Sequence, residues 1–183
     1  MKKTVVLILL MLSLLSCSND NDSNVQVTVP EGSIVLKIDG VETYFNVDAG
    51  ATLQTIPWEG QTATKLSIRG KRNAEIDAEN ILIWFFVTPA TEIDEGTYPD
   101  LDKQIYHFLE LNADWNGDLY NYGSNRLIDN FYSSKSTIVR IDSLAQGVFS
   151  GNVAIGTGPA GVNQPPFYHK VTGGQFNVRI TNQ

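Results

Sequence analysis

The sequence predicts an all-β fold, an antiparallel β-sandwich of about eight to ten strands. Apolar and polar residues alternate with a period of two in several short segments, as in strands that bury one face. Pairs of residues that favour turns recur between these segments. These pairs are Asp39-Gly40, Ala49-Gly50, Glu59-Gly60, Glu95-Gly96, Asn116-Gly117 and Gly173-Gly174. The 183 residues contain no convincing amphipathic helix, so the all-β class is preferred.

The alternation is clearest near the end of the chain, where Phe176, Val178 and Ile180 are separated by polar residues. The same pattern occurs in residues 34–38, 66–69 and 139–142. Each of these segments is therefore expected to be a strand with one buried face.

Residues 81–87 are apolar throughout, which predicts a central strand buried on both faces with Trp84 in the core. A sheet with one apolar face must cover it, so two packed sheets or a closed lipocalin-like β-barrel are the options. The sandwich is preferred because residues 58–64 and 112–134 resemble long irregular connections.

The segment before Cys17 resembles a bacterial lipoprotein signal. Two lysines precede residues 4–15, which are largely apolar, and Ser16 is a small residue directly before the only cysteine. A membrane-spanning helix needs about 20 apolar residues, so this shorter stretch fits a cleaved signal. We therefore expect residues 1–16 to be a signal peptide.

The lipoprotein resemblance implies a diacylglyceryl thioether on Cys17 and a further acyl chain, such as palmitate, on its amine. Several buried chains, at about 0.8 kcal/mol per CH₂, anchor a protein to a membrane. Residues 17–30 are then the lipidated cysteine and a flexible polar tether, and residues 31–183 a single β-domain. Ser18, where an Asp would signal retention in the inner membrane, favours the outer membrane. The acidic residues after it resemble the surface-export signal of Bacteroidota lipoproteins, although a solvated linker has the same composition. The expected location is the cell outer membrane, facing outward.

The charge of the chain excludes some partners. It has 20 acidic and 13 basic residues, a net charge of −7, and loss of the two signal lysines makes this −9. Nucleic acid and anionic lipid are poor partners for such a surface. Acidity is uneven, since Asp142 is the last acidic residue. The domain after Cys17 has no cysteine, so it has no disulfide or thiol chemistry.

Three segments carry a resemblance to a known family. They are residues 32–40 (Gly-Ser-Ile-Val-Leu-Lys-Ile-Asp-Gly), 147–151 (Gly-Val-Phe-Ser-Gly) and 171–178 (Val-Thr-Gly-Gly-Gln-Phe-Asn-Val). They are similar to segments of small outer-membrane lipoproteins of Bacteroidota whose function is unknown. Val148 and Gly173 depart from that family's threonine and asparagine. The resemblance implies an anchored β-domain and assigns no active residues.

Catalytic, cofactor and metal motifs are weak. The G-x-G-x-x-G at residues 156–161 is followed by prolines and no acid, so no dinucleotide cofactor is expected. Asp114, Asn116 and Asp118 alternate as calcium ligands do, but a hairpin turn through Asn116-Gly117 explains them better.

No catalytic residue is predicted. His107 lies on the same side of its expected strand as Ile105, Leu109 and Leu111, so it is expected to be a hydrogen-bonded histidine near the core. His169 is also expected to have a structural role. The carboxylates of residues 75–79 and 92–95 lie in turn-like segments, where a solvated cluster is expected rather than a glycoside hydrolase.

Four aromatic residues are the candidate ligand-binding residues: Trp58, Trp115, Tyr120 and Tyr122. They lie in segments rich in Asn, Asp and Gly that resemble loops. Exposed rings beside amides and carboxylates suit a glycan or an envelope protein partner, while the alternative is that they cap the core. The preferred function is a non-enzymatic, surface-anchored binding module. The alternatives are a structural envelope lipoprotein and a carboxylate hydrolase.

Overall fold

The computed structural model describes residues 25–115, 118–124, 134–155 and 168–182, and the predicted signal peptide lies outside them. The described residues form eleven β-strands and no helix. In chain order these are β1 (Ser33–Ile38), β2 (Val41–Tyr44), β3 (Val47–Trp58), β4 (Gln61–Lys71), β5 (Asn80–Val87), β6 (Gly96–Tyr98), β7 (Ile105–Trp115), β8 (Asp118–Gly123), β9 (Ser134–Ile141), β10 (Leu144–Ile155) and β11 (Tyr168–Asn182). The all-β prediction is confirmed, with more strands than the eight to ten expected. Within the described residues, no helix has the length and hydropathy needed to cross a membrane.

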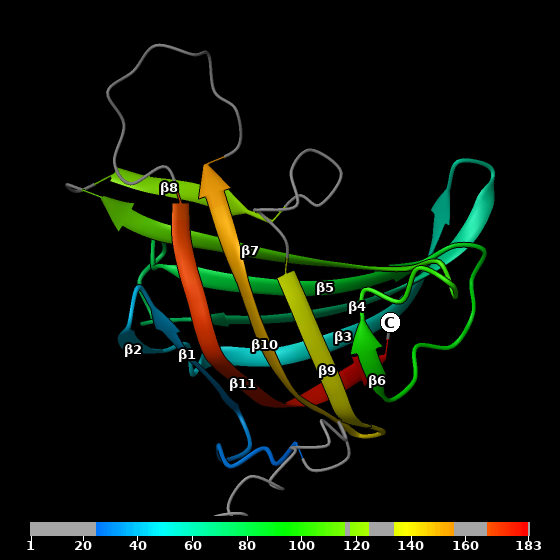
Figure 1. The fold of residues 1–183 in the computed structure, drawn as a ribbon, viewed down its shortest axis with the longest axis horizontal. Helices are drawn as coiled ribbons and strands as arrows, with labels where there is room; N and C mark the ends of the chain where they lie inside the picture. The colour runs from blue at the N-terminus through cyan, green and yellow to red at the C-terminus, as the bar shows by residue number, and fades with distance from the viewer. Residues whose placement is uncertain (1–24, 116–117, 125–133, 156–167, 183) are drawn as a thin grey trace, which may run out of the picture.

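The strands form one mixed sheet that folds over on itself into two layers. Their hydrogen-bonded order is β2-β1-β11-β3-β4-β5-β7-β8-β10-β9-β6, with a further pairing between β10 and β11. Figure 1 shows β9, β10 and β11 crossing in front of β3, β4, β5 and β7. The core lies between these two layers, as in a sandwich.

Two pairings join the layers into a closed ring of strands. β10 reaches β8 through two residue pairs, the last of which joins Ile155 and Tyr122. β11 continues past β1 and pairs with β3 in parallel, beginning at Ile180 opposite Ala51. All other pairings of the described strands are antiparallel. The ring of strands is therefore closed, as the alternative barrel arrangement required, although the strands pack in two layers.

Two of the predicted turns form tight hairpins. Asp39 and Gly40, which join β1 to β2, have φ angles of 50° and 87°, and Glu59 and Gly60, which join β3 to β4, have 45° and 80°. Positive φ at both central residues is the type I′ geometry, whose twist matches that of the paired strands. Residues 58–64 are therefore two strand ends and a turn, and the prediction of an irregular connection there is wrong.

Two other predicted turns lie inside long strands. Ala49 and Gly50 belong to β3, and Gly173 and Gly174 belong to β11. The β3–β4 and β10–β11 pairings both shift register near these glycines. Gly173 has a φ of 59°, and a Cβ on Gly174 would lie 2.7 Å from the ring of Phe149. The glycines therefore permit a bulge and a close ring contact instead of a turn.

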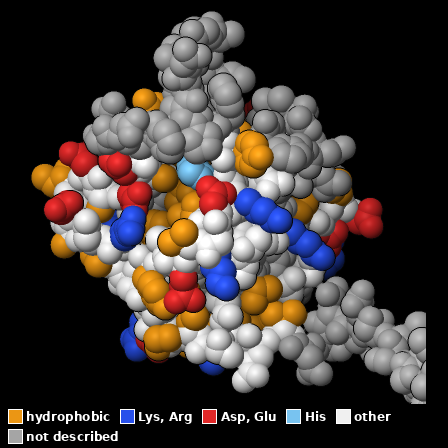
Figure 2. Space-filling view, turned by 60° about the vertical axis from the view of Figure 1, so that its left-hand side comes forward, with side chains coloured by type: hydrophobic (Ala, Val, Ile, Leu, Met, Phe, Trp, Pro, Cys, Tyr) orange, Lys and Arg blue, Asp and Glu red, His pale blue; other side chains and the backbone are white. Residues whose placement is uncertain are grey.

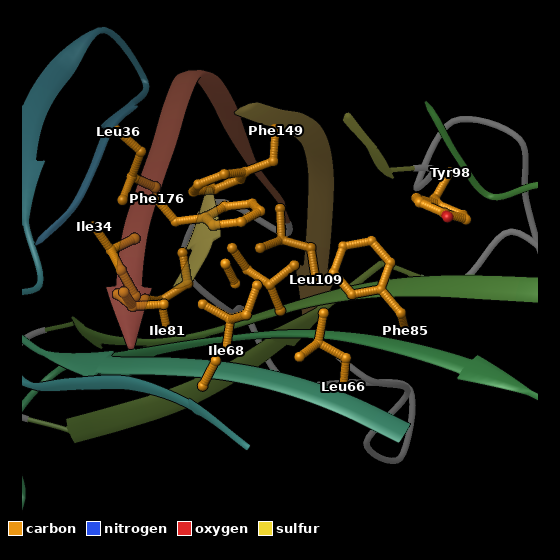
Figure 3. Close-up of a cluster of buried hydrophobic side chains, with 14 of the residues drawn as sticks. Ile34, Leu36, Leu66, Ile68, Ile81, Phe85, Tyr98, Leu109, Phe149 and Phe176 are labelled. Carbon is orange, nitrogen blue, oxygen red and sulfur yellow. The ribbon is translucent and has the colours of Figure 1, made fainter. Parts of the chain in front are cut away.

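Side chains from both layers fill the core. The rings of Phe149 in β10 and Phe176 in β11 are 3% and 0% exposed, and their centroids lie 6.2 Å apart. Figure 3 shows them facing Leu66, Ile68 and Leu109 of the other layer. The predicted period-two alternation is confirmed in β1, β4 and β11. The burial of these side chains provides the main driving force for folding.

Gly147 in β10 has no room for a side chain. A Cβ there would lie 2.4 Å from the carbonyl oxygen of Thr137 and 2.5 Å from Cζ of Phe176. We predict that Gly147→Ala lowers the free energy of unfolding by about 1–3 kcal/mol, because the ring and the β9–β10 pairing must both shift. Gly123→Ala is the control, since no atom lies within 4 Å of its added Cβ. It should change this free energy by less than about 0.5 kcal/mol. Urea unfolding measures both, and equal losses would contradict the close packing at Gly147.

Candidate functional site

The central strand β5 carries aromatic side chains on the face that points away from the core. Ile81, Ile83 and Phe85 are buried in the core. Trp84 and Phe86 alternate with them and so lie on the opposite face. Trp84 is partly exposed there. The prediction that Trp84 belongs to the core is therefore wrong, because the alternation of the strand turns it outward.

Four rings from three strands form a continuous row, here named the aromatic strip: Trp58, Phe86, Trp84 and Phe108. Trp58 contacts Phe86 edge-on with ring centroids 4.9 Å apart, and Phe86 contacts Trp84 in the same way at 6.5 Å. Trp84 stacks on Phe108, its cross-strand partner in β7, at 4.2 Å with the ring planes 18° apart. Both geometries are those that aromatic pairs prefer.

Two charged side chains fix the indole of Trp84. Lys65 Nζ lies 4.9 Å from its ring centroid, within cation–π distance. The indole Nε1 donates a hydrogen bond of 3.0 Å to Glu110 Oε1. Because β4 and β7 flank β5 on opposite sides, Lys65 and Phe108 cover opposite faces of the indole. Trp58 is the most open ring of the strip, with 45% of its surface exposed.

The four aromatic residues predicted to bind a ligand do not come together. Trp58 ends β3 and contacts Phe86, which pairs with the second residue of β7. Tyr120 pairs near the other end of the 11-residue strand β7. Trp115 is the last residue of β7, and its side chain lies outside the described residues. Trp58 is thus at the opposite end of the sheet from Tyr120 and Tyr122.

Tyr122 is buried, with 0% of its surface exposed. Its ring contacts His169 edge-on at 4.4 Å, and its hydroxyl has no hydrogen-bond partner among the described residues. Burial raises the pKa of this hydroxyl. Tyr120 lies on the same side of β8, partly buried against the core. The expectation of exposed loop aromatics is wrong here because these residues form a strand and turn both rings inward.

His169 has a structural partner, as expected. Its Nδ1 lies 2.6 Å from Oδ2 of Asp39, and the backbone N–H of Lys170 donates to Oδ1 of Asp39 at 2.8 Å. Burial alone would raise the pKa of Asp39, but the hydrogen bonds from His169 and Lys170 outweigh it and hold the pKa below its ordinary value. These contacts fasten the β1–β2 turn to β11.

The predicted calcium turn lies at the β7–β8 connection. The backbone N–H of Asp114 donates to Glu79 Oε1 at 3.0 Å. Asn116 and the side chain of Asp118 lie outside the described residues, as does Cys17. Among the residues that the structure describes, no three His, Cys, Asp or Glu side chains come together as a metal site requires. The calcium turn remains a prediction from the sequence.

A wide cleft of about 990 Å³ lies between β3, β4, residues 90–95 and the turn after β9. Four carboxylates line it: Glu92, Asp94, Glu95 and Asp142. The first three side chains are exposed. Arg140 pairs with Asp142 at 2.7 Å, and this interaction, with the Leu144 N–H, lowers the Asp142 pKa to about 2. A glycosidase needs one carboxyl that stays protonated as a general acid, and Asp142 does not supply it.

His107 lies in a buried network of serine hydroxyls. Its Nδ1 is 2.9 Å from Ser134 Oγ, and its Nε2 is 2.7 Å from Ser136 Oγ. Ser124 Oγ lies 2.9 Å from Ser134 Oγ and accepts a 2.9 Å bond from the backbone N–H of Leu109. A neutral imidazole satisfies both serines, because one ring nitrogen donates and the other accepts. The prediction of a hydrogen-bonded histidine near the core is confirmed.

Burial fixes the protonation state of His107. Only 7% of its surface is exposed. Desolvation lowers the pKa of His107 to about 4, and a hydrogen bond with the backbone of Ser134 offsets this only in part. The ring is therefore neutral at neutral pH and weakly basic. No described carboxylate bonds to either ring nitrogen as in a catalytic triad, so the network suits a structural role.

We predict that the free energy of unfolding falls by up to about 3 kcal/mol as the pH drops from 6.5 to 4. In this window His107 binds a proton in the unfolded chain but not in the folded chain. The free energy of unfolding therefore falls by about 1.4 kcal/mol for each pH unit. Asp39 and Asp142, with lowered pKa values, act below this window. Urea unfolding near pH 4.5 and near pH 7 measures the slope. His107→Gln should remove it, and an unchanged slope in this variant would contradict the assignment.

Comparison with known protein families, with curated proteins and with solved structures finds no match for this chain. The resemblance to Bacteroidota lipoproteins therefore depends on the sequence motifs alone. Any assignment of function follows from the residues of this chain, chiefly the predicted anchor, the aromatic strip and the cleft.

Proposed function

We propose that this protein is a lipid-anchored lipoprotein of the cell envelope and a non-enzymatic binding module. The anchor would be Cys17, at the outward-facing surface of the outer membrane. Support for it comes from the lysines, the short apolar stretch and the Ser16-Cys17 pair. The ligand would bind to the aromatic strip.

The position of the aromatic strip is the observation that supports binding best. A strand that buries one face in the core usually presents polar side chains on the other. β5 and β7 instead carry Trp84, Phe86 and Phe108 there, next to Trp58. Trp58 is 45% exposed, Trp84 and Phe108 are partly exposed, and Phe86 is covered, with 7% of its surface exposed. Apolar side chains gathered on an outer face are typical of an interaction surface.

A protein is the class of partner that the strip supports best. Lys65 and Phe108 cover both faces of Trp84, so a sugar ring cannot stack on it. Tryptophan is enriched among the residues that contribute most to protein–protein binding. Lys65 and Glu110 supply charged groups beside the rings, as at the rim of such interfaces.

A glycan is the second candidate, because of Trp58. This ring is 45% exposed, and its cross-strand partner Gln61 is an exposed amide. An open ring beside an amide offers stacking and directed hydrogen bonds to a sugar. Binding of a glycan would depend on Trp58 and not on Lys65. This difference distinguishes a glycan ligand from a protein partner.

The two alternative roles, a structural lipoprotein and a carboxylate hydrolase, have less support. A structural lipoprotein of envelope assembly needs no ligand-binding surface, so the strip argues for the binding module. A carboxylate hydrolase would use Glu92, Asp94 and Glu95 of the cleft, where the fourth acid, Asp142, is already paired with Arg140.

We predict that Cys17→Ser abolishes lipid attachment. The native chain should incorporate a clickable palmitate analogue and fractionate with the outer membrane. The variant should lose the label and move to the soluble fraction, because the thioether cannot form. Ser18→Ala, one residue away, should keep both properties. Protease added to intact cells should degrade the native protein if it faces outward. A labelled, membrane-bound Cys17→Ser variant would contradict the anchor.

We predict that Trp58→Ala weakens partner binding at least about 30-fold, the loss expected for a residue that dominates an interface. A photo-crosslinking residue at Ser67, which pairs with Trp84 across β4 and β5, reports the contact in cells. Tyr44→Ala is the matched control, because this aromatic residue is 50% exposed on the distant strand β2. It should leave crosslinking unchanged.

Lys65→Ala separates the two classes of ligand. A protein adduct that depends on both Trp58 and Lys65 supports a protein partner. Retention by polysaccharide that depends on Trp58 alone supports a glycan. Crosslinking that Trp58→Ala and Tyr44→Ala affect equally would contradict binding at the strip.

A further inference from the structure

The strands β9, β10 and β11 contain no Asp or Glu, although the chain has 20 of these residues. The three strands are 8, 12 and 15 residues long and form one layer of the fold (Figure 1). The outward side of this layer is here named the β9–β11 face. Its defining residues, all exposed or partly exposed, are Lys135, Thr137, Val148, Ser150, Lys170 and Gln175.

The β9–β11 face has a positive charge of its own. Lys135 and Lys170 are exposed, and neither forms an ion pair with a carboxylate among the described residues. Arg140 and Arg179, also in this layer, are already paired with carboxylates. Figure 2, which brings forward the left-hand side of Figure 1, shows acidic and basic side chains interspersed over the surface in view. The net charge of −7 therefore conceals one face that anionic groups can approach.

The chain that leads toward Cys17 leaves the domain from this same face. Val25, the first described residue, lines a shallow groove of about 350 Å³ together with Lys135 and Gln175. The backbone N–H of Thr28 donates to Gln175 Oε1 at 2.8 Å, which fixes the segment on the face.

The reach of the tether is short compared with the domain. Cys17 and Val25 are eight residues apart. An extended chain spans at most about 3.6 Å per residue, so Val25 lies within about 29 Å of a lipidated Cys17. A compact domain of this size is about 40 Å across. The opposite face therefore cannot lie flat on the bilayer, because that would put Val25 about 40 Å from it.

We infer, on the basis of the proposed anchor at Cys17, that the β9–β11 face lies against the membrane. Lys135 and Lys170 contact the phosphates of anionic lipid headgroups. Each lysine near such a surface strengthens the attraction roughly fivefold, within about one Debye length. The aromatic strip, on the outward side of the other layer, then faces the medium where its partner is found.

The orientation is measured with the full lipidated chain in vesicles. The domain has no cysteine of its own, so Ser150→Cys places a fluorophore on the β9–β11 face and Ser67→Cys places one beside the strip. The vesicles contain phosphatidylcholine with phosphatidylglycerol, and a quencher is attached to the headgroups. Quenching at position 150 should exceed that at position 67 at least about threefold, and the excess should shrink in high salt or without phosphatidylglycerol.

Charge reversal tests the role of the lysines. Lys135→Glu with Lys170→Glu should remove the excess quenching at position 150. Lys71→Glu with Lys103→Glu, the same change of charge away from this face, should keep it. Equal quenching at the two positions, or an excess that survives the first pair of changes, overturns the inference and leaves the anchor intact. Absence of acyl chains on Cys17 by mass spectrometry overturns the proposed function, and the inference with it.

Discussion

The core of this protein depends on the packing of Phe149 and Phe176, two rings from neighbouring strands of one layer that fill the space between the two layers. Each ring lies where a glycine of the neighbouring strand leaves room, Gly174 beside Phe149 and Gly147 beside Phe176. Both rings can therefore lie close against their neighbouring strands inside the core, with 3% and 0% of their surfaces exposed. One side of each strand faces these rings and is buried, and the other side lies on the outside of the fold. The aromatic strip and the β9–β11 face are two such outer sides, so their positions depend on this packing.

Residue alternation made much of the fold predictable from the sequence. It identified residues 34–38 of β1, 66–69 of β4 and 176–180 of β11, where the polar residues mark the outer face. It failed at Trp84, because the run around it has no polar residue to show which side is out. It also failed at Tyr120 and Tyr122, where Asn and Gly neighbours resembled a loop. Asn121 bonds across the outer face to Asn112, so the alternation of rings and amides was a strand signal.

The candidate site was only partly predictable. The sequence singled out Trp58 but not the rings beside it, since Phe86, Trp84 and Phe108 become neighbours only through the register of β5 and β7. The sequence showed that the acidic residues are unevenly distributed, but it did not show that the strands without them form one face of the fold. Only the sheet order shows that β9, β10 and β11 form one layer, and that this layer lies on the other side of the core from the strip.

The pairing of β11 with β1, β3 and β10 has a consequence for how the chain folds. Ser33 pairs with Asn177, and Ile180 pairs with Ala51, so partners lie far apart in the sequence. Such a high contact order makes folding slow, because loop-closure entropy is lost before the distant contacts form. The early strands cannot complete their sheet until residues 168–182 have emerged. The sheet of this protein is therefore completed only after its last strand has been synthesised.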